Sequence, residues 1–165
     1  MVKKIMSKKA LISGGTGFIG SHVAEELLKR DWKIQIIDKY GFKDYQDLDG
    51  LKNHKNITFH EIDLNNFDQI ASITNDFDYI FHFAAKLGVA DVTSEPYEVL
   101  KTNISTTENI INYSLLNQNL SRFIFASTSE VYSGTQKHFN LIVPTPESEP
   151  LTIDNVSSPR SSYML

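Results

Sequence analysis

The chain has 165 residues, with 20 acidic and 16 basic side chains, a formal net charge of −4 and 41% hydrophobic residues. This composition is typical of one soluble domain, and ten Phe and seven Tyr residues supply enough apolar surface to exclude disorder of the whole chain. The chain has no cysteine, which excludes a disulfide scaffold and a Cys-ligated metal site, and its acidic balance disfavours nucleic acid as a partner.

The N-terminal segment is rich in lysine, as the start of a signal peptide would be. The apolar stretch that follows it is too short for the core of a signal peptide. No run approaches the roughly 18 apolar residues that cross a bilayer, so we expect a cytoplasmic protein without a membrane partner. The five histidines show no metal-ligand spacing, and we predict no metal site.

The first half of the chain alternates short apolar runs with an amphipathic stretch. The apolar runs predict strands over residues 10–13, 34–37 and 57–62. Between the first two strands, residues 18–30 carry apolar side chains at helical spacing and predict a helix. Residues 40–56 are polar and irregular, which indicates a connecting segment.

The second half continues the alternation. Residues 67–73 predict a short helix and residues 97–116 a long one, with strands over 79–84 and 122–126. The run at 79–84 is almost wholly apolar, as in a strand that is covered on both faces of a parallel sheet. Five strands alternating with helices indicate βαβ units with right-handed crossovers and predict an α/β fold with a parallel sheet.

The C-terminal part of the sequence changes character. Residues 133–160 contain four of the five prolines and show no periodicity, so we expect a long loop toward the substrate side of the domain. Residues 161–165 resemble the start of a helix. We expect residues 1–165 to form one domain.

Residues 14–20 (GGTGFIG) follow the first predicted strand and open the first helix. Gly14, Gly17 and Gly20 would let the backbone turn tightly and approach a pyrophosphate, to which the helix N-terminus offers free N–H groups. Asp38 ends the second strand, 24 residues after Gly14, where a carboxylate can bind ribose hydroxyls and repel a 2′-phosphate. The pattern favours NAD over NADP, and a purely structural glycine turn is the alternative.

Three further polar residues each allow a structural or a functional interpretation. Asp63 ends the third strand and could bond the adenine amino group or cap the following segment. His82 lies in an apolar strand and is interpreted as a hydrogen-bonded core residue rather than a catalyst. Asn103 lies within a helix and is interpreted as a bridge to neighbouring backbone.

As an ordered set, these motifs resemble the extended short-chain dehydrogenase/reductases, in particular the NAD-dependent epimerase/dehydratase family that acts on nucleotide sugars. The resemblance covers nearly the whole chain and rests on residues 14–20 (GGTGFIG), Asp38, Asp63 with Leu64, residues 82–85 (HFAA), Asn103, residues 127–132 (STSEVY) and Tyr163. It implies a Rossmann-type doubly wound parallel sheet, with the five predicted strands in the order 3-2-1-4-5. It also implies NAD as the cofactor, a nucleotide-sugar substrate and a homodimer in the complete enzyme.

The resemblance also implies roles for individual residues. Those assigned to the cofactor are Gly14, Gly17, Phe18, Ile19, Gly20, Asp38, Asp63, Leu64, Ala84, Ala85 and Lys86. Phe18 and Ile19 would offer backbone amides to the pyrophosphate, while Asp63 and Leu64 would flank the adenine. The last three residues of the set would line the path of the cofactor past the fourth strand.

Three residues would carry the chemistry that the resemblance implies. Tyr163 resembles the tyrosine of the family's Tyr-x-x-x-Lys motif, which removes a proton from a sugar hydroxyl while hydride passes to NAD. Thr128 would bond that hydroxyl, and Glu130 would assist at the sugar ring. The lysine of the motif would fall beyond residue 165, so we expect the chain as given to be an NAD-binding domain without full activity, incomplete before a sixth strand and the C-terminal substrate region.

Residues 127–132 bear on the type of reaction. Dehydratases of this family carry Asp-Glu after the threonine, and Ser129 stands in place of that aspartate. A dehydratase must both protonate and deprotonate its substrate, so it needs an acid and a base. With one carboxylate instead of two, this pair is less obvious in the segment. The segment resembles UDP-glucuronate decarboxylases, as does Pro159-Arg160 before Tyr163. The residues are also compatible with an epimerase, and with a non-catalytic NAD-binding fragment or sensor.

Overall fold

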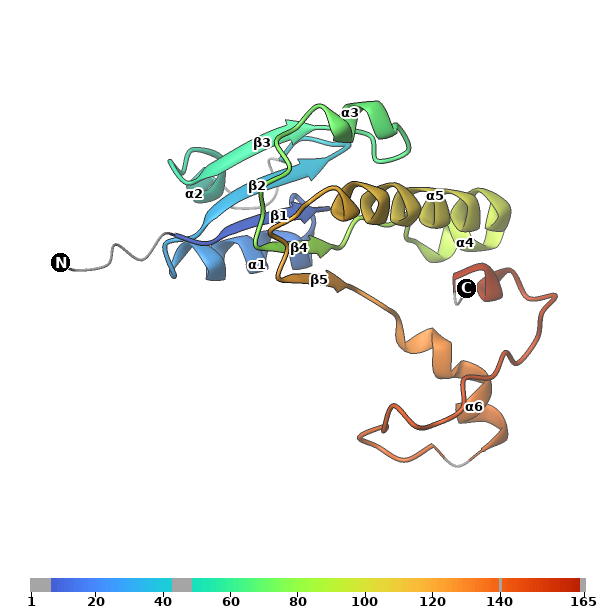
Figure 1. Ribbon diagram of the computed structural model, residues 1–165. Coiled ribbons are helices and arrows are strands. Elements are labelled where there is room, and N and C mark those ends of the chain that lie inside the picture. The colour runs from blue at the N-terminus through green and yellow to red at the C-terminus, as the bar shows by residue number, and fades with distance from the viewer. Residues whose placement is uncertain (1–6, 43–48, 140, 164–165) are drawn as a thin grey trace. The chain divides into compact units, whose positions relative to one another are not determined.

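A computed structural model describes residues 7–42, 49–139 and 141–163 (Figure 1). In this part of the chain, parallel strands form one sheet in the order β3-β2-β1-β4-β5, which confirms the predicted Rossmann-type topology. The strands are β1 (Lys9–Ser13), β2 (Lys33–Asp38), β3 (Ile57–Glu61), β4 (Tyr79–His82) and β5 (Arg122–Phe125).

The predicted helices are confirmed as α1 (Phe18–Leu28), α3 (Phe67–Ala71) and α5 (Pro96–Leu115). Two short helices were not expected from the sequence, namely α2 (Asp49–Lys52) and α4 (Val89–Ser94). Each spans fewer than two helical turns, so no apolar periodicity can develop within it.

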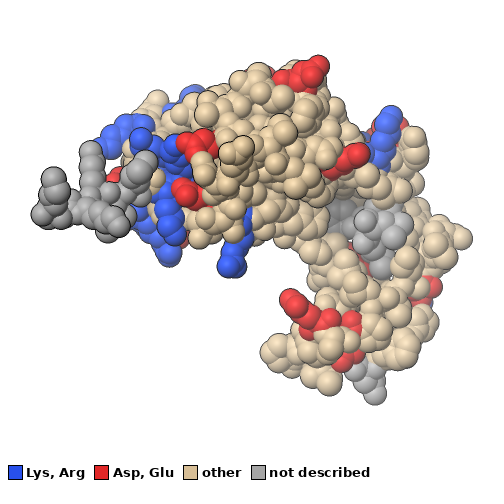
Figure 2. Space-filling view, in the orientation of Figure 1, with Lys and Arg blue, Asp and Glu red and all other residues tan. Residues whose placement is uncertain are grey.

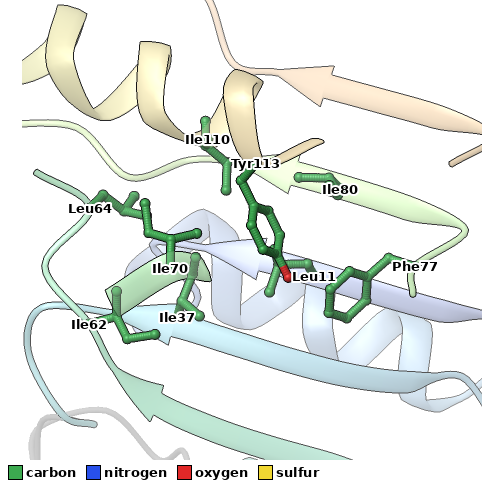
Figure 3. Close-up of a cluster of buried hydrophobic side chains, with 9 residues drawn as sticks. All are labelled: Leu11, Ile37, Ile62, Leu64, Ile70, Phe77, Ile80, Ile110 and Tyr113. Atoms are coloured by element: carbon green, nitrogen blue, oxygen red, sulfur yellow. The ribbon is translucent and has the colours of Figure 1, made fainter. Parts of the chain in front are cut away.

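The sheet buries apolar side chains on both faces. Leu11 of β1 points into a cluster that α3 and α5 complete with Ile70, Ile110 and Tyr113 (Figure 3). The neighbouring strand residue Ile12 belongs to a second cluster, in which Ala24 and Leu27 of α1 take part. Successive residues of a strand point to opposite faces, so one strand contributes to both clusters, and the sheet is doubly wound.

Contacts divide the chain into two compact units, with boundaries after Ala85, within α5 and after Ala126. The first unit comprises Met1–Ala85 and Ser105–Ala126, and the second comprises Lys86–Ile104 and Ser127–Leu165. Both apolar clusters lie in the first unit. The expectation of one domain over residues 1–165 stays a prediction.

The long loop expected over residues 133–160 is corrected by the structure. It contains the helix α6 (Ser133–His138), and the 3₁₀ helix η2 (Pro159–Tyr163) begins at its end. Gly134 and Thr135 of α6 are buried, and their contacts with Thr152 and Pro150 fix the helix. These contacts are distant in sequence, which explains why the local pattern showed no helix.

Charged side chains are unevenly distributed over the face drawn in Figure 2. Lysine and arginine gather toward the end of the sheet at which the strands start. At this end Lys29 and Arg30 follow α1, and Lys33 begins β2. The glycine turn follows β1 at the opposite, carboxyl end of the strands. Within the described ranges, no helix is both long and apolar enough to cross a membrane.

Candidate functional site

The glycine turn is tightly packed against the end of β4. Gly14 has a φ of +71°, a left-handed conformation that glycine adopts without strain. A Cβ added at Gly14 would lie 2.6 Å from the backbone nitrogen of Ala84, and one added at Gly20 would collide with the Gly14 carbonyl oxygen. The structure therefore brings three predicted site residues together, and only glycine fits at the two turn positions.

The turn presents the N-terminus of α1 to solvent. Gly17 is the N-cap residue, so no capping side chain covers the end of the helix. The first helical hydrogen bond runs from the Ser21 amide to the Gly17 carbonyl (3.0 Å), which leaves the amides of Phe18 and Ile19 in the unpaired first turn. The side chains of Phe18 and Ile19 are 73% and 56% exposed. This arrangement can bind a phosphate through backbone amides and the helix dipole.

Asp38 is oriented by the glycine turn. Its Oδ2 accepts hydrogen bonds from the hydroxyl (2.6 Å) and the amide (3.2 Å) of Thr16, and its Oδ1 accepts one from the Tyr40 amide (3.1 Å). The carboxylate is therefore held beside the phosphate-binding turn with lone-pair capacity left for a ligand hydroxyl. Sequence reasoning assigned no role to Thr16, because its bond to Asp38 joins residues 22 positions apart.

Asp63 forms an ion pair that the sequence did not indicate. Its Oδ2 lies 3.0 Å from the Lys39 ammonium, while its Oδ1 accepts hydrogen bonds from the amide (3.0 Å) and the side chain (2.9 Å) of Asn65. Burial alone would raise the pKa of Asp63, but the Asn65 and Lys39 hydrogen bonds outweigh it and hold that pKa below its usual value. The cap of α3 is Asn66, so the alternative that Asp63 caps this helix is wrong.

The remaining cofactor candidates of the first unit differ in accessibility. Leu64 is only 4% exposed and belongs to the core cluster, and its carbonyl accepts a hydrogen bond from the Asn109 side chain (2.8 Å). Ala84 is half-buried and Ala85 exposed. Leu64 can therefore contribute its backbone to a ligand more readily than its side chain.

Lys86 is fixed by Asn103. The Asn103 side chain accepts a hydrogen bond from the Lys86 amide (2.7 Å) and donates one to the Lys86 carbonyl (3.2 Å), which confirms the interpretation of Asn103 as a bridge to backbone. The Lys86 ammonium lies 2.9 Å from Glu95, and this hydrogen bond raises the pKa of Lys86 above its usual value. The lysine is therefore engaged with an acidic partner.

His82 is a core residue, as interpreted from the sequence. Its side chain is 2% exposed, and its Nδ1 lies 2.6 Å from the Ser13 hydroxyl and its Nε2 3.2 Å from the Thr107 hydroxyl. Burial lowers the pKa of His82 to about 4, so the ring is neutral at neutral pH. Its hydrogen bonds connect β1, β4 and α5.

The second unit brings two of the three catalytic candidates together. Thr128 caps the 3₁₀ helix η1 (Ser129–Tyr132), because its hydroxyl accepts a hydrogen bond from the Glu130 amide (3.2 Å). The Glu130 carboxylate lies 2.5 Å from the Arg160 guanidinium, a partner to which sequence reasoning gave no role. Tyr163 is the last residue of η2, and its side chain lies outside the described part of the structure.

Similarity to known proteins extends over almost the whole chain. The family model described as "NAD dependent epimerase/dehydratase family" matches residues 10–165. The chain is 39% identical over 130 residues to a UDP-N-acetyl-alpha-D-glucosaminuronate decarboxylase of Bacillus cytotoxicus, a match that covers 77% of this chain and 38% of the relative. It is 29% identical over 131 residues to UDP-glucuronic acid decarboxylase 1 of Danio rerio, covering 79% of this chain and 30% of the relative.

Solved structures of epimerases share the fold. The UDP-Glc/GlcNAc 4-epimerase of Campylobacter jejuni matches with a TM-score of 0.77 and 31% identity, over 96% of this chain and 46% of its own. The UDP-N-acetylglucosamine 4-epimerase of Methanobrevibacter ruminantium matches with a TM-score of 0.75 and 31% identity, over 96% and 47%. The chain thus spans less than half the length of these relatives. With the glycine turn, Asp38 and the parallel sheet in place, it belongs to the NAD-dependent epimerase/dehydratase family.

Proposed function

We propose that this chain binds NAD at the carboxyl ends of its strands and forms the cofactor-binding part of a nucleotide-sugar enzyme. The observation that carries the proposal is the glycine turn, where a Cβ at Gly14 would fill the space beside Ala84. The tight turn places the first-turn amides of α1, which no capping side chain covers, where they can bind a pyrophosphate. Bound NAD would supply a hydride acceptor, and the residues of the chain orient it.

Asp38 gives the proposed site its preference for NAD. The bonds from Thr16 and Tyr40 hold the Asp38 carboxylate in place and use three of its roughly four lone-pair positions, so one position is left to accept a hydrogen bond from a ribose hydroxyl. A phosphate at the 2′ position would meet the same negative charge and be repelled. Phe18 and Ile19 bind the pyrophosphate through their amides, and Ala84, Ala85 and Lys86 line the path beyond it.

The proposed substrate is a nucleoside-diphosphate sugar, one hydroxyl of which is transiently oxidised. Thr128 bonds this hydroxyl, and Tyr163 accepts its proton. Glu130 acts at the sugar ring, where its ion pair with Arg160 sets the direction of the carboxylate. Four-epimerases are among the similar solved structures, which supports an epimerase/dehydratase-type reaction. The complete enzyme is proposed to be a homodimer.

Decarboxylation of a nucleotide-linked uronic acid is the second candidate. It is favoured by the 39% identity to a UDP-N-acetyl-alpha-D-glucosaminuronate decarboxylase and by Ser129, which leaves Glu130 as the single carboxylate of its segment. In this reaction, oxidation of the sugar at C4 makes loss of CO₂ easier, because the ketone accepts the electron pair of the breaking bond. The same residues would hold the substrate in both candidates.

Calorimetric titration of the folded 165-residue polypeptide with NAD and NADP tests the cofactor proposal. We expect saturable binding of NAD and weaker binding of NADP. Asp38→Asn should weaken NAD binding and reduce the discrimination against NADP, because hydrogen bonds to a charged acceptor contribute about 1.5–3 kcal/mol each before compensation by water. A variant with both affinities unchanged would show that Asp38 does not bind the ribose.

Activity is tested separately. Tyr163 is the third residue from the end of the 165-residue sequence, so the polypeptide lacks the lysine of the Tyr-x-x-x-Lys pair. We expect this polypeptide to bind NAD as a non-catalytic fragment and to form no NADH with UDP-glucose or UDP-glucuronate. Sugar-dependent absorbance at 340 nm would contradict this expectation while leaving the binding proposal intact.

A further inference from the structure

Asp38, the last residue of β2, and Lys39, which follows it, have opposite consequences for cofactor choice. Asp38 repels a 2′-phosphate, whereas a basic side chain close to this position is what accommodates the 2′-phosphate of NADP in folds of this kind. Lys39 supplies such a side chain directly after Asp38. The sequence therefore contains one determinant for each cofactor, and the structure shows how the second is engaged.

The Lys39 ammonium is paired with the end of the neighbouring strand. Asp38 of β2 stands opposite Glu61 of β3 in the parallel register, and Asp63 follows two residues later. The Lys39 Nζ lies 3.0 Å from Asp63 Oδ2, and this hydrogen bond raises the pKa of Lys39. The ion pair therefore joins the carboxyl ends of β2 and β3 beside the proposed adenosine site.

Asp63 is itself held in a fixed orientation. Both donors of Asn65 bind its Oδ1, at 3.0 Å and 2.9 Å, so that Oδ2 is directed to Lys39. Three of the roughly four lone-pair positions of the carboxylate are thus used within the protein. A bond from Asp63 to the adenine amino group would have to share an oxygen with Asn65 or Lys39.

We propose that Asp63 determines cofactor specificity through Lys39. By pairing with the Lys39 ammonium, Asp63 withdraws this positive charge, which directly follows Asp38 in the sequence, from the 2′ position of the adenosine ribose. Asp38 then meets the ribose without competition from Lys39, and a 2′-phosphate cannot use the Lys39 ammonium as its counter-charge. Asp63 is a positioning residue in this role. The proposal rests on the NAD site proposed above.

The test is a double-mutant cycle on the 165-residue chain, with NAD and NADP affinities measured by calorimetry at low salt. Asp63→Asn should shift the NADP/NAD affinity ratio about three- to fivefold toward NADP, the range expected for one exposed charge pair. Lys39→Met alone should change the ratio by less than about twofold, because the ammonium is already withdrawn. In the double variant, the shift caused by Asp63→Asn should disappear.

Asp68→Asn is the matched control, since it removes one exposed acidic charge from the first turn of α3. It reports how far the loss of any nearby negative charge favours NADP, and should shift the ratio less than Asp63→Asn. Asp63→Glu retains the charge and should keep the wild-type ratio. Circular dichroism verifies folding, and Asp63→Ser serves as a second neutral variant should Asp63→Asn not fold.

Two results would overturn the proposal. If the shift persists in the double variant, Asp63 acts through its own charge and not through Lys39. If the neutral variants weaken NAD and NADP equally, Asp63 contacts the adenine, which both cofactors share. Failure of the NAD site gives a different result, because the wild-type chain would then bind neither cofactor.

Discussion

At the scale of single residues, Gly14 is a position at which both the backbone conformation and the packing of the proposed site exclude a Cβ. Gly14→Ala would force a left-handed backbone on a residue with a Cβ and place that Cβ 2.6 Å from the Ala84 nitrogen. The left-handed conformation alone costs about 1–2 kcal/mol, so we expect a loss of about 2 kcal/mol or more in the free energy of unfolding. Urea denaturation measures this loss of stability. Calorimetry should show that the variant also binds NAD more weakly.

Gly41→Ala is the matched control for this substitution. Gly41 follows β2 as Gly14 follows β1, but an added Cβ at Gly41 meets no described atom within 4 Å. The free energy of unfolding of the Gly41→Ala variant should stay within about 0.5 kcal/mol of the wild-type value, as for other surface substitutions. Equal effects of the two substitutions would show that the close packing of Gly14 against Ala84 is unimportant.

His82 links the stability of the sheet to pH. Its pKa is about 4 in the folded chain and 6.5 in the unfolded chain, so the unfolded state binds more protons between these values. The contribution of neutral His82 is fully present above pH 6.5 and is lost as the pH falls toward 4. We expect the free energy of unfolding to decrease by up to about 3 kcal/mol over this window.

Denaturation at several pH values compares the wild type with His82→Gln. The glutamine cannot be protonated in this range, so the variant should be less stable at pH 7 but should lose the part of the slope that His82 contributes. An unchanged slope between pH 6.5 and 4 would contradict the assignment of a buried neutral histidine.

At the scale of elements, helices and strands could be predicted from the sequence where apolar periodicity and turn chemistry agree. The helix α1 and its flanking strands were predicted correctly, because the glycine motif marks the helix start and the strands are nearly continuous apolar runs. The helix α6 was missed, since its six residues pack through Gly134 and Thr135 onto residues far along the chain.

The same distinction holds within the candidate site. Gly14 and Asp38 could be recognised because their spacing along the chain carries the information. The partners that orient the acidic residues could not be recognised, namely Thr16 for Asp38, Lys39 for Asp63 and Arg160 for Glu130. Each of these pairs joins residues separated by more than 20 positions, so it exists only once the elements are packed.

At the scale of the whole molecule, the two compact units are stabilised by different interactions. Both large apolar clusters lie in the first unit. In the second unit α6 is held largely by polar contacts, including the Gly134 amide bonded to the Thr152 carbonyl (3.1 Å) and Asp154 paired with Lys137 (2.9 Å). Apolar burial is the main favourable term in folding, so we expect the first unit to be the more stable.

Gly134→Ala tests whether the two units unfold independently of one another. Its Cβ would collide with the Thr152 carbonyl, so amide hydrogen exchange should become faster in the described residues of 133–163. NAD at a hundredfold excess over its Kd should stabilise the unit that binds it by about 2.7 kcal/mol and slow exchange in β1, β2 and β4 in wild type and variant alike. If Gly134→Ala instead raised exchange across the sheet or abolished NAD binding, the units would unfold as one, and the cofactor site would depend on both.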